Sequence, residues 1–360
     1  MIQKIKNLNI GVKIALVFIV LILLSVMLVW IGYSSLKLVA HKSDISQRAS
    51  NISELMLEAR INEVKFMRSG TEDKAEKVGS SISKIKAEIK ELKNKMNIEV
   101  EKEEMDEIKE LVIEFETAFN NYAQTTYEQQ DYRNSFVSKE KEIIKPLDSL
   151  SDVQNQELTD LIKNESSLES IARKQESLII IKELIKHVQK MGNEERNLML
   201  NLANDQQQEK YINNTLNQFQ QAEEHLQELK DTFLEEDIKQ VEQLLANLGA
   251  GREAFDDIVA SERKKDSQMA TMVTAGEEVS KQINELAAKK KVEIAATITT
   301  RVSILLGVLI IAIIVGVIFS YLTTQSITKR VKKVMHFLRE MSENGGDLTR
   351  RIEVDSEDEI

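Results

Sequence analysis

The chain has 360 residues, with 59 acidic against 48 basic side chains and a formal net charge of −11, and this sign disfavours nucleic acid as a partner. The absence of cysteine excludes a disulfide framework, a thiolate metal site and a nucleophilic cysteine. Four scattered histidines show no metal-ligand spacing, and the sequence has no Ser/His/Asp arrangement or glycine-rich phosphate loop. We therefore expect no catalytic residues, no metal and no cofactor, and a protein that is not an enzyme.

The first feature along the chain is an apolar run, Ile14 to Tyr33, that contains no charged side chain. Its length is that of a helix crossing about 30 Å of hydrocarbon. Three lysines precede it, which favours a cytoplasmic N-terminus at residues 1–13 and a transmembrane helix at 14–35. A cleaved signal peptide is the alternative, but the run is long for one and no clear small-residue cleavage site follows, so we expect an uncleaved anchor.

The region 36–301 is predicted to be helical nearly throughout. Apolar residues recur in it at spacings of three and four, and Pro146 is its single proline. Breaks are expected at Ser69-Gly70, near Asn97, and around residues 203–206 and 234–236. The six expected helices cover residues 35–68, 72–96, 101–160, 166–202, 206–231 and 235–301.

The lengths of these helices suggest an architecture. Helices 101–160 and 235–301 are about twice as long as the others, and the compact solution is two stacked four-helix bundles that share them. We expect the membrane-proximal bundle to add helices 35–68 and 166–202, and the distal bundle to add helices 72–96 and 206–231. The fold class is all-α.

Two short segments recur at nearly constant offset. Glu63 to Met67 resembles Glu195 to Met199, and Ala118 to Tyr122 resembles Ala254 to Ile258. The domain is therefore predicted to be a duplication of one helical unit.

A second uncharged apolar run, Val302 to Leu322, ends the domain, and four basic residues follow it closely. Both termini are therefore expected in the cytoplasm of a multi-pass cell-membrane protein, with residues 36–301 outside. After the span, apolar residues alternate at spacings of four and three, the seam of a short coiled coil. This seam consists of Ile327, Val331, Val334, Leu338 and Met341.

The segment Ala59 to Phe66, its weaker echo before Leu198 and the two Ala-Phe pairs resemble the helical bimodular sensor domain of bacterial methyl-accepting chemotaxis proteins, over about residues 34–301. The tail at 323–360 is similar to the start of a HAMP domain, a parallel four-helix signal converter, although Arg330 stands where that family usually has proline. Because most of the second HAMP helix is missing, we expect a fragment or a truncated form of a longer protein. The most specific tail residues are Gly345 to Thr349, and Asp358 and Glu359 before Ile360.

The resemblance implies a homodimeric transmembrane chemoreceptor. It would sense a small extracellular molecule and act through the second span and the HAMP residues, Asp358 and Glu359 included, on a cytoplasmic chemotaxis kinase and its adaptor. One alternative is the same input on a sensor histidine kinase or nucleotide cyclase. Another is a membrane-tethered helical spacer, which an entirely apolar interior would favour.

Polar interruptions of the apolar seams are candidate ligand residues, because an unpaired buried charge costs several kcal/mol unless a partner offsets it. Arg60 and Glu63 are either an internal ion pair or part of a binding site. Four arginines are predicted to lie at one height along the bundle, and a group of guanidinium side chains is well suited to bind carboxylates. The resemblance implies carboxylate binding through the position of Arg60. It places further arginines at Ile61 and Gly192, so an amino acid or another small polar ligand stays open. The predicted ligand-binding set is Arg60, Glu63, Thr126, Gln129, Arg133, Arg196 and Arg263.

Overall fold

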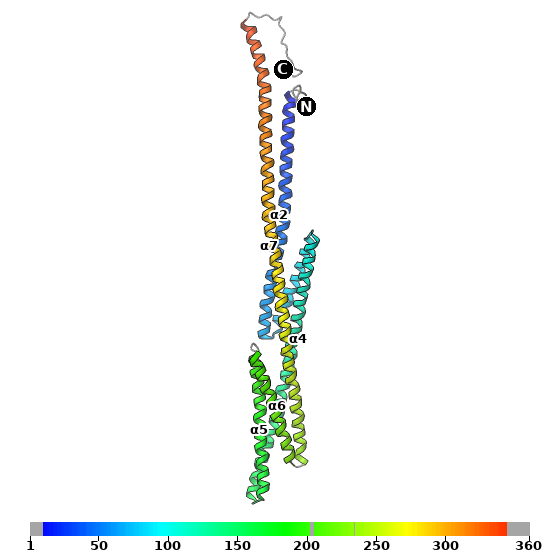
Figure 1. The fold of residues 1–360 in the computed structure, drawn as a ribbon, viewed down its shortest axis with the longest axis vertical. Helices are drawn as coiled ribbons and strands as arrows, with labels where there is room; N and C mark the ends of the chain where they lie inside the picture. Colours follow the sequence, from blue (N-terminus) through cyan, green and yellow to red (C-terminus); the bar gives the residue numbers. More distant parts are fainter. Residues whose placement is uncertain (1–9, 202–204, 234, 344–360) are drawn as a thin grey trace. The chain divides into compact units, whose positions relative to one another are not determined.

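The computed structural model describes residues 10–201, 205–233 and 235–343. Within these ranges the chain forms α-helices joined by short turns and no strand, so the all-α fold class is confirmed (Figure 1). The helices are α2 Ile10–Ser69, α3 Glu72–Lys95, α4 Glu99–Lys163, α5 Leu168–Leu200, α6 Asp205–Thr232 and α7 Glu235–Glu343.

The helix ends follow local sequence signals. Gly70 adopts a left-handed φ of 62°, and its N–H donates to the carbonyl of Phe66 at 2.7 Å, which closes α2 in the way glycine commonly closes helices. The Ser167 side chain accepts a hydrogen bond from the N–H of Ser170 at 3.2 Å and caps the start of α5. The expected breaks are confirmed to within a few residues.

Both apolar runs continue without interruption into domain helices. α2 contains the first run and α7 the second, with window mean hydropathies of 3.3 and 3.2. Each is long and apolar enough to cross a membrane, and most of the large apolar side chains in the runs are exposed, as lipid contact requires. The spans and the first and last domain helices, predicted as separate elements, are thus parts of single helices.

The chain divides into two compact units, each described here by itself. Unit 1 comprises residues 1–54, 88–102 and 281–360; unit 2 comprises residues 55–87 and 103–280. In unit 1, α2 meets α3 through Arg48 and Glu88, whose Nη1 and Oε2 atoms lie 2.8 Å apart. α7 meets the first turn of α4 through Lys290 and Glu101, a buried pair with 2.5 Å between Nζ and Oε1.

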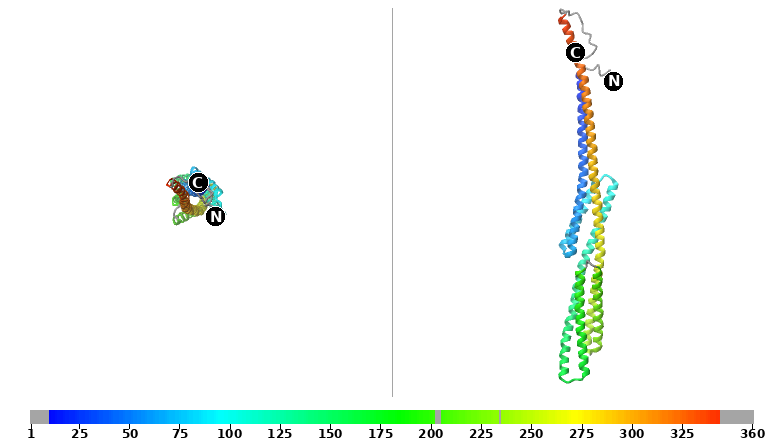
Figure 2. Two further views of the ribbon diagram at one scale, coloured as in Figure 1. Left: turned by 90° about the horizontal axis from the view of Figure 1, so that it is seen from above. Right: turned by 60° about the vertical axis from the view of Figure 1, so that its left-hand side comes forward.

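Unit 2 contains two groups of helices, and both groups include α4 and α7. In the first, α2 packs on α4 through Phe66 and Phe119, with ring centroids 5.5 Å apart, edge to face. In the second, α5 and α6 lie side by side (Figure 2) and share one apolar core with α4 and α7. Phe136, Phe219 and Phe255 lie within this core, with centroids 6.0 to 6.2 Å apart.

The predicted choice of bundle partners is wrong. The helix predicted at 35–68 is joined to α3 by the ion pairs Arg48–Glu88 and Lys95–Asp44, and α6 packs on α5. The physical reason is the short distance along the chain between consecutive helices, because two residues separate α2 from α3 and four separate α5 from α6.

We predict that Phe255→Ala lowers the free energy of unfolding by about 3–5 kcal/mol, because it leaves a cavity between the rings of Phe136 and Phe219. Thermal unfolding followed by circular dichroism measures the change. Ile179→Ala, at an exposed position on α5, is the control and should change stability by less than about 0.5 kcal/mol. Equal effects of both substitutions would contradict the assignment of this core.

Candidate functional site

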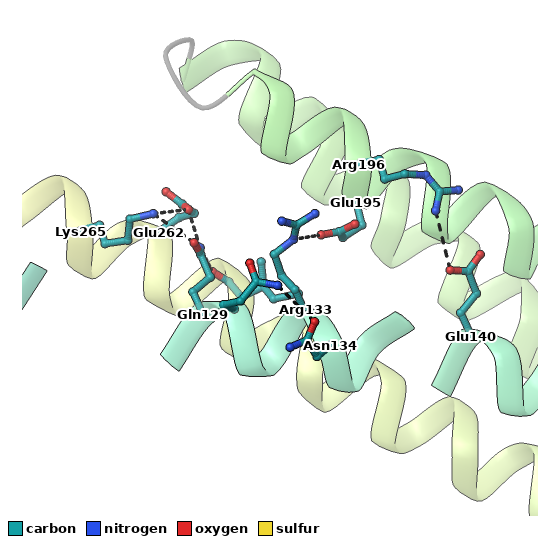
Figure 3. Close-up of polar contacts among 10 residues, drawn as sticks. Gln129, Arg133, Asn134, Glu140, Glu195, Arg196, Glu262 and Lys265 are labelled. Carbon is teal, nitrogen blue, oxygen red and sulfur yellow. Dashed lines mark hydrogen bonds and ion pairs between the residues drawn. The ribbon is translucent and has the colours of Figure 1, made fainter. Parts of the chain in front are cut away.

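The centre of the candidate site is a buried polar group of three residues, which we call the Gln129 triad. Gln129 on α4 donates through Nε2 to the carboxylate of Glu262 on α7. Lys265, one turn further along α7, donates to Gln129 Oε1 at 3.0 Å and to Glu262 Oε1 at 2.9 Å. All three residues are more than nine-tenths buried, and their mutual bonds offset the cost of desolvating the two charges (Figure 3).

Tyr122 extends the triad along α4. The Lys265 ammonium lies 5.6 Å from the centroid of the Tyr122 ring, a cation–π distance. Burial, reinforced by the negative charges of Glu262, Asp266 and Glu63, raises the pKa of Tyr122 to about 12. The phenol therefore stays neutral and is not a candidate proton carrier at physiological pH.

Glu63 and Arg60 form an internal ion pair, as one of the two sequence interpretations predicted. Glu63 is only 2% exposed, and its Oε2 lies 3.8 Å from Arg60 Nε. Burial raises the pKa of the Glu63 carboxyl, and the Arg60 charge opposes that rise. Arg60 Nη1 also donates to the carbonyl of Val273 at 3.2 Å, and a Cβ at Gly276 would lie 3.0 Å from the arginine side chain. The absence of a side chain at Gly276 thus makes room for Arg60.

Arg133 and Arg196 come together around acidic residues of α4 and α5. Arg133 Nε donates to Glu195 Oε1 at 2.8 Å, and Arg196 Nη1 lies 4.0 Å from Glu140 Oε2 (Figure 3). The Glu140 carboxylate occupies the space over Gly192, where an added Cβ would lie 2.3 Å from Oε1. Burial raises the pKa of Glu140, which the Arg196 charge lowers and the Glu195 charge raises further. The absence of a side chain at Gly192 therefore makes room for the partly buried carboxyl of Glu140.

The remaining predicted residues have separate partners. Arg263 Nη2 donates to Glu209 Oε1 at 3.2 Å, and Thr126 Oγ1 donates to the carbonyl of Tyr122 at 2.8 Å. Each of the four predicted arginines thus pairs with a different glutamate, and Arg60 and Arg263 do not share an acid with the Arg133–Arg196 group. Their role in ligand binding stays a prediction.

A cavity of about 420 Å³ lies between α5, α6 and α7 within unit 2. Four apolar and four charged side chains line it together with one glutamine, and it is open to solvent beside the exposed Arg263 and Glu209. Glu262 belongs both to its wall and to the Gln129 triad, so the cavity is connected to α4 through hydrogen bonds. The lining residues are Leu198, Gln208, Glu209, Ile212, Val259, Glu262, Arg263, Asp266 and Met269.

Sequence reasoning found Gln129 and Arg263 but missed Glu262, Lys265 and Asp266. Glu262 and Lys265 continue the buried face of α7 at spacings of four and three after Ile258, so the rule that selected Gln129 also applies to them. No sequence signal places Asp266 at a cavity, because the cavity arises from the packing of three helices.

Comparison with known proteins finds a match to one family model and to several solved structures. Residues 33–196 match the model of HBM, the helical bimodular sensor domain. This part of the chain is therefore similar to an HBM sensor domain. It begins at the end of the first apolar run and covers α3, α4 and most of α5, whereas the sequence resemblance was expected to extend to residue 301.

One of the solved structures is the TorS sensor domain in complex with TorT in the presence of TMAO. It shares 13% identity with this chain, with a TM-score of 0.43, and the match covers 69% of this chain and 99% of that one. No curated protein matches the chain significantly. Among the residues that the structure describes, no three His, Asp or Glu side chains are grouped as metal ligands.

We predict that Glu63→Gln stabilises the protein increasingly as the pH rises above 4.5, the ordinary pKa of glutamate. Below that pH the carboxyl is neutral in both states. Above it the unfolded chain ionises while the buried carboxyl resists, so the parent loses stability until the pH passes the raised pKa of Glu63 in the folded state. Thermal midpoints measured across this range, with Glu54→Gln at an exposed position of the same helix as control, check the effect. A constant difference between Glu63→Gln and the parent would contradict it.

Proposed function

We propose that the chain is the input portion of a transmembrane receptor whose helical domain binds a small extracellular molecule. The observation that supports this most directly is the HBM match at residues 33–196, within a region framed by two candidate membrane spans. The cavity between α5, α6 and α7 is the proposed ligand site. The alternative of a passive spacer is disfavoured, because a spacer has no need of the buried Gln129 triad.

The proposed route of the signal is α7. This helix contains cavity residues from Val259 to Met269 and continues unbroken through the second apolar run to Glu343. A shift or tilt of α7 on ligand binding would therefore be carried to the cytoplasmic side, where we expect both termini from the Lys and Arg near the membrane ends. The predicted coiled-coil residues Ile327, Val331, Val334 and Leu338 lie on α7, whereas the side chain of Met341 and all of Asp358 and Glu359 lie outside the described parts.

The output we propose is a chemotaxis kinase complex, because the tail resembles a HAMP domain and the outer domain resembles that of chemotaxis receptors. HBM domains also occur in sensor kinases, and the second candidate is input to a histidine kinase. Loss of directed swimming in a deletion strain, with no change in transcription, favours the first; a transcriptional response to the ligand without chemotaxis favours the second.

We further propose a homodimer in which α2 faces α2 of a second copy. Leu57, Ile61 and Val64 are 62%, 46% and 44% exposed, at the four-three spacing of a coiled-coil seam. A HAMP domain is a four-helix unit to which one chain supplies two helices, so a chain with a HAMP segment also requires a second copy. The exposed seam and this requirement support the same assembly.

We predict that a compound from a panel of carboxylates, amino acids, amines and polyols raises the thermal midpoint by roughly 5–10 °C at a hundredfold excess over its Kd. Met269→Trp should abolish the shift by filling the cavity, and it should be tolerated because Met269 is 41% exposed at the cavity wall. Ile179→Trp on the outer face of α5 is the matched control. A shift that survives Met269→Trp but disappears in Arg60→Ala would move the site to the Arg60–Glu63 pair.

We predict that Ile61→Glu weakens self-association about tenfold or more, because the two carboxylates would face each other across the symmetry axis. Sedimentation equilibrium of the full chain in detergent measures this. Ile179→Glu, at a position on α5 that is 58% exposed against 46% for Ile61, should leave the association constant unchanged. The same loss in both variants, or in neither, would contradict the α2 interface.

A further inference from the structure

The charged groups around the cavity are predominantly negative. Its wall contains the carboxylates of Glu209, Glu262 and Asp266 against a single guanidinium, that of Arg263. Behind the wall, the ammonium of Lys265 bonds to Glu262 at 2.9 Å. With Lys265 included, carboxylates still exceed cations, so the field within the cavity favours a positive charge.

Arg263 is already engaged in a way that disfavours an anionic ligand. It reaches from α7 to Glu209 on α6 with 3.2 Å between Nη2 and Oε1. A carboxylate entering the cavity would compete with Glu209 for this arginine while facing Glu262 and Asp266. An ammonium group would be attracted to all three acids, and it could replace Arg263 at Glu209, because that ion pair is largely exposed and therefore weak.

The apolar part of the wall sets the rest of the ligand. Leu198, Ile212, Val259 and Met269 come from all three helices that form the cavity. Its volume of about 420 Å³ is within the range of roughly 300–1,000 Å³ usual for small-molecule sites. These walls suit an alkyl body several carbons long, with the charged group directed toward the acids.

We propose that this cavity binds a small organic cation, an alkyl chain ending in an ammonium group. The inference rests on the proposed function, in which the same cavity is the ligand site of a sensor. It replaces the expectation of a carboxylate ligand at Arg263 with a ligand of opposite charge, for which Asp266, Glu262 and Glu209 are the attracting groups and Arg263 is the competitor.

The test titrates three probes with the same short alkyl chain into the full-length chain in nanodiscs, by calorimetry: butylammonium, 1-butanol and butanoate. Butylammonium should bind about tenfold more tightly than the other two, and less tightly as ionic strength rises. Asp266→Asn should weaken its binding about tenfold, whereas Arg263→Gln should strengthen it severalfold by removing a like charge. Asp256→Asn, at an exposed position of α7 outside the cavity, is the control and should change nothing.

Asp266→Asn and Arg263→Gln are expected to change the affinity for butylammonium in opposite directions, and this separates a failure of the inference from a failure of the proposed function. Butanoate binding that is tightest of the three and is lost in Arg263→Gln would overturn the cation assignment while leaving the cavity as the sensor site. Butylammonium binding that Asp266→Asn does not alter, or no binding of butylammonium at all, would also overturn it. Butylammonium binding that persists unchanged in Met269→Trp would remove the cavity itself as the site and contradict both.

Discussion

The long helices α4 and α7 each bury side chains in both helix groups of the domain, and every other helix depends on them for a packing surface. α4 presents Phe119 to α2 and Phe136 to α6, while α7 presents Phe255 to the second group and accepts the Arg60 hydrogen bond at Val273 from the first. The chain has no disulfide to supplement this packing. Loosening of either group therefore reaches the other through two continuous helices, which is a property that a sensor can use.

Buried charges are the places where this packing is least secure. Glu63 and Glu195, at corresponding positions of the two similar segments, are 2% and 1% exposed, and each lies beside one arginine: Arg60 of the same helix for Glu63, and Arg133 of α4 for Glu195. In each, Oε2 is buried and receives no hydrogen bond from the described residues. Such half-satisfied carboxyls weaken a core compared with apolar side chains of the same size. On the predicted duplication, a buried glutamate at this position belongs to the unit that was duplicated.

The helices and their seams were predictable from sequence, because each end has its own signal, such as Gly70, and each seam repeats with the helical period. The partners of each helix were not, because an apolar stripe specifies burial but not what covers it. Gln129 was found as a polar interruption of a seam, but its partners Glu262 and Lys265 lie on α7, more than 130 residues away. The cavity depends on how Leu198, Ile212 and Val259 pack together, and no local pattern encodes that gap.

Signalling requires that the ligand bind two states of the protein with different affinity, and Glu262 provides a physical basis for that difference. In the structure its carboxylate bonds to Gln129 and Lys265. On the proposal of a cationic ligand, a positive charge in the cavity would attract the same carboxylate and weaken those bonds, which would give the triad a second arrangement. Because Gln129 is on α4 and Lys265 on α7, exchanging one arrangement for the other changes how tightly these two helices are held together. On the same proposal, α7 would carry that change along an unbroken helix to the second span.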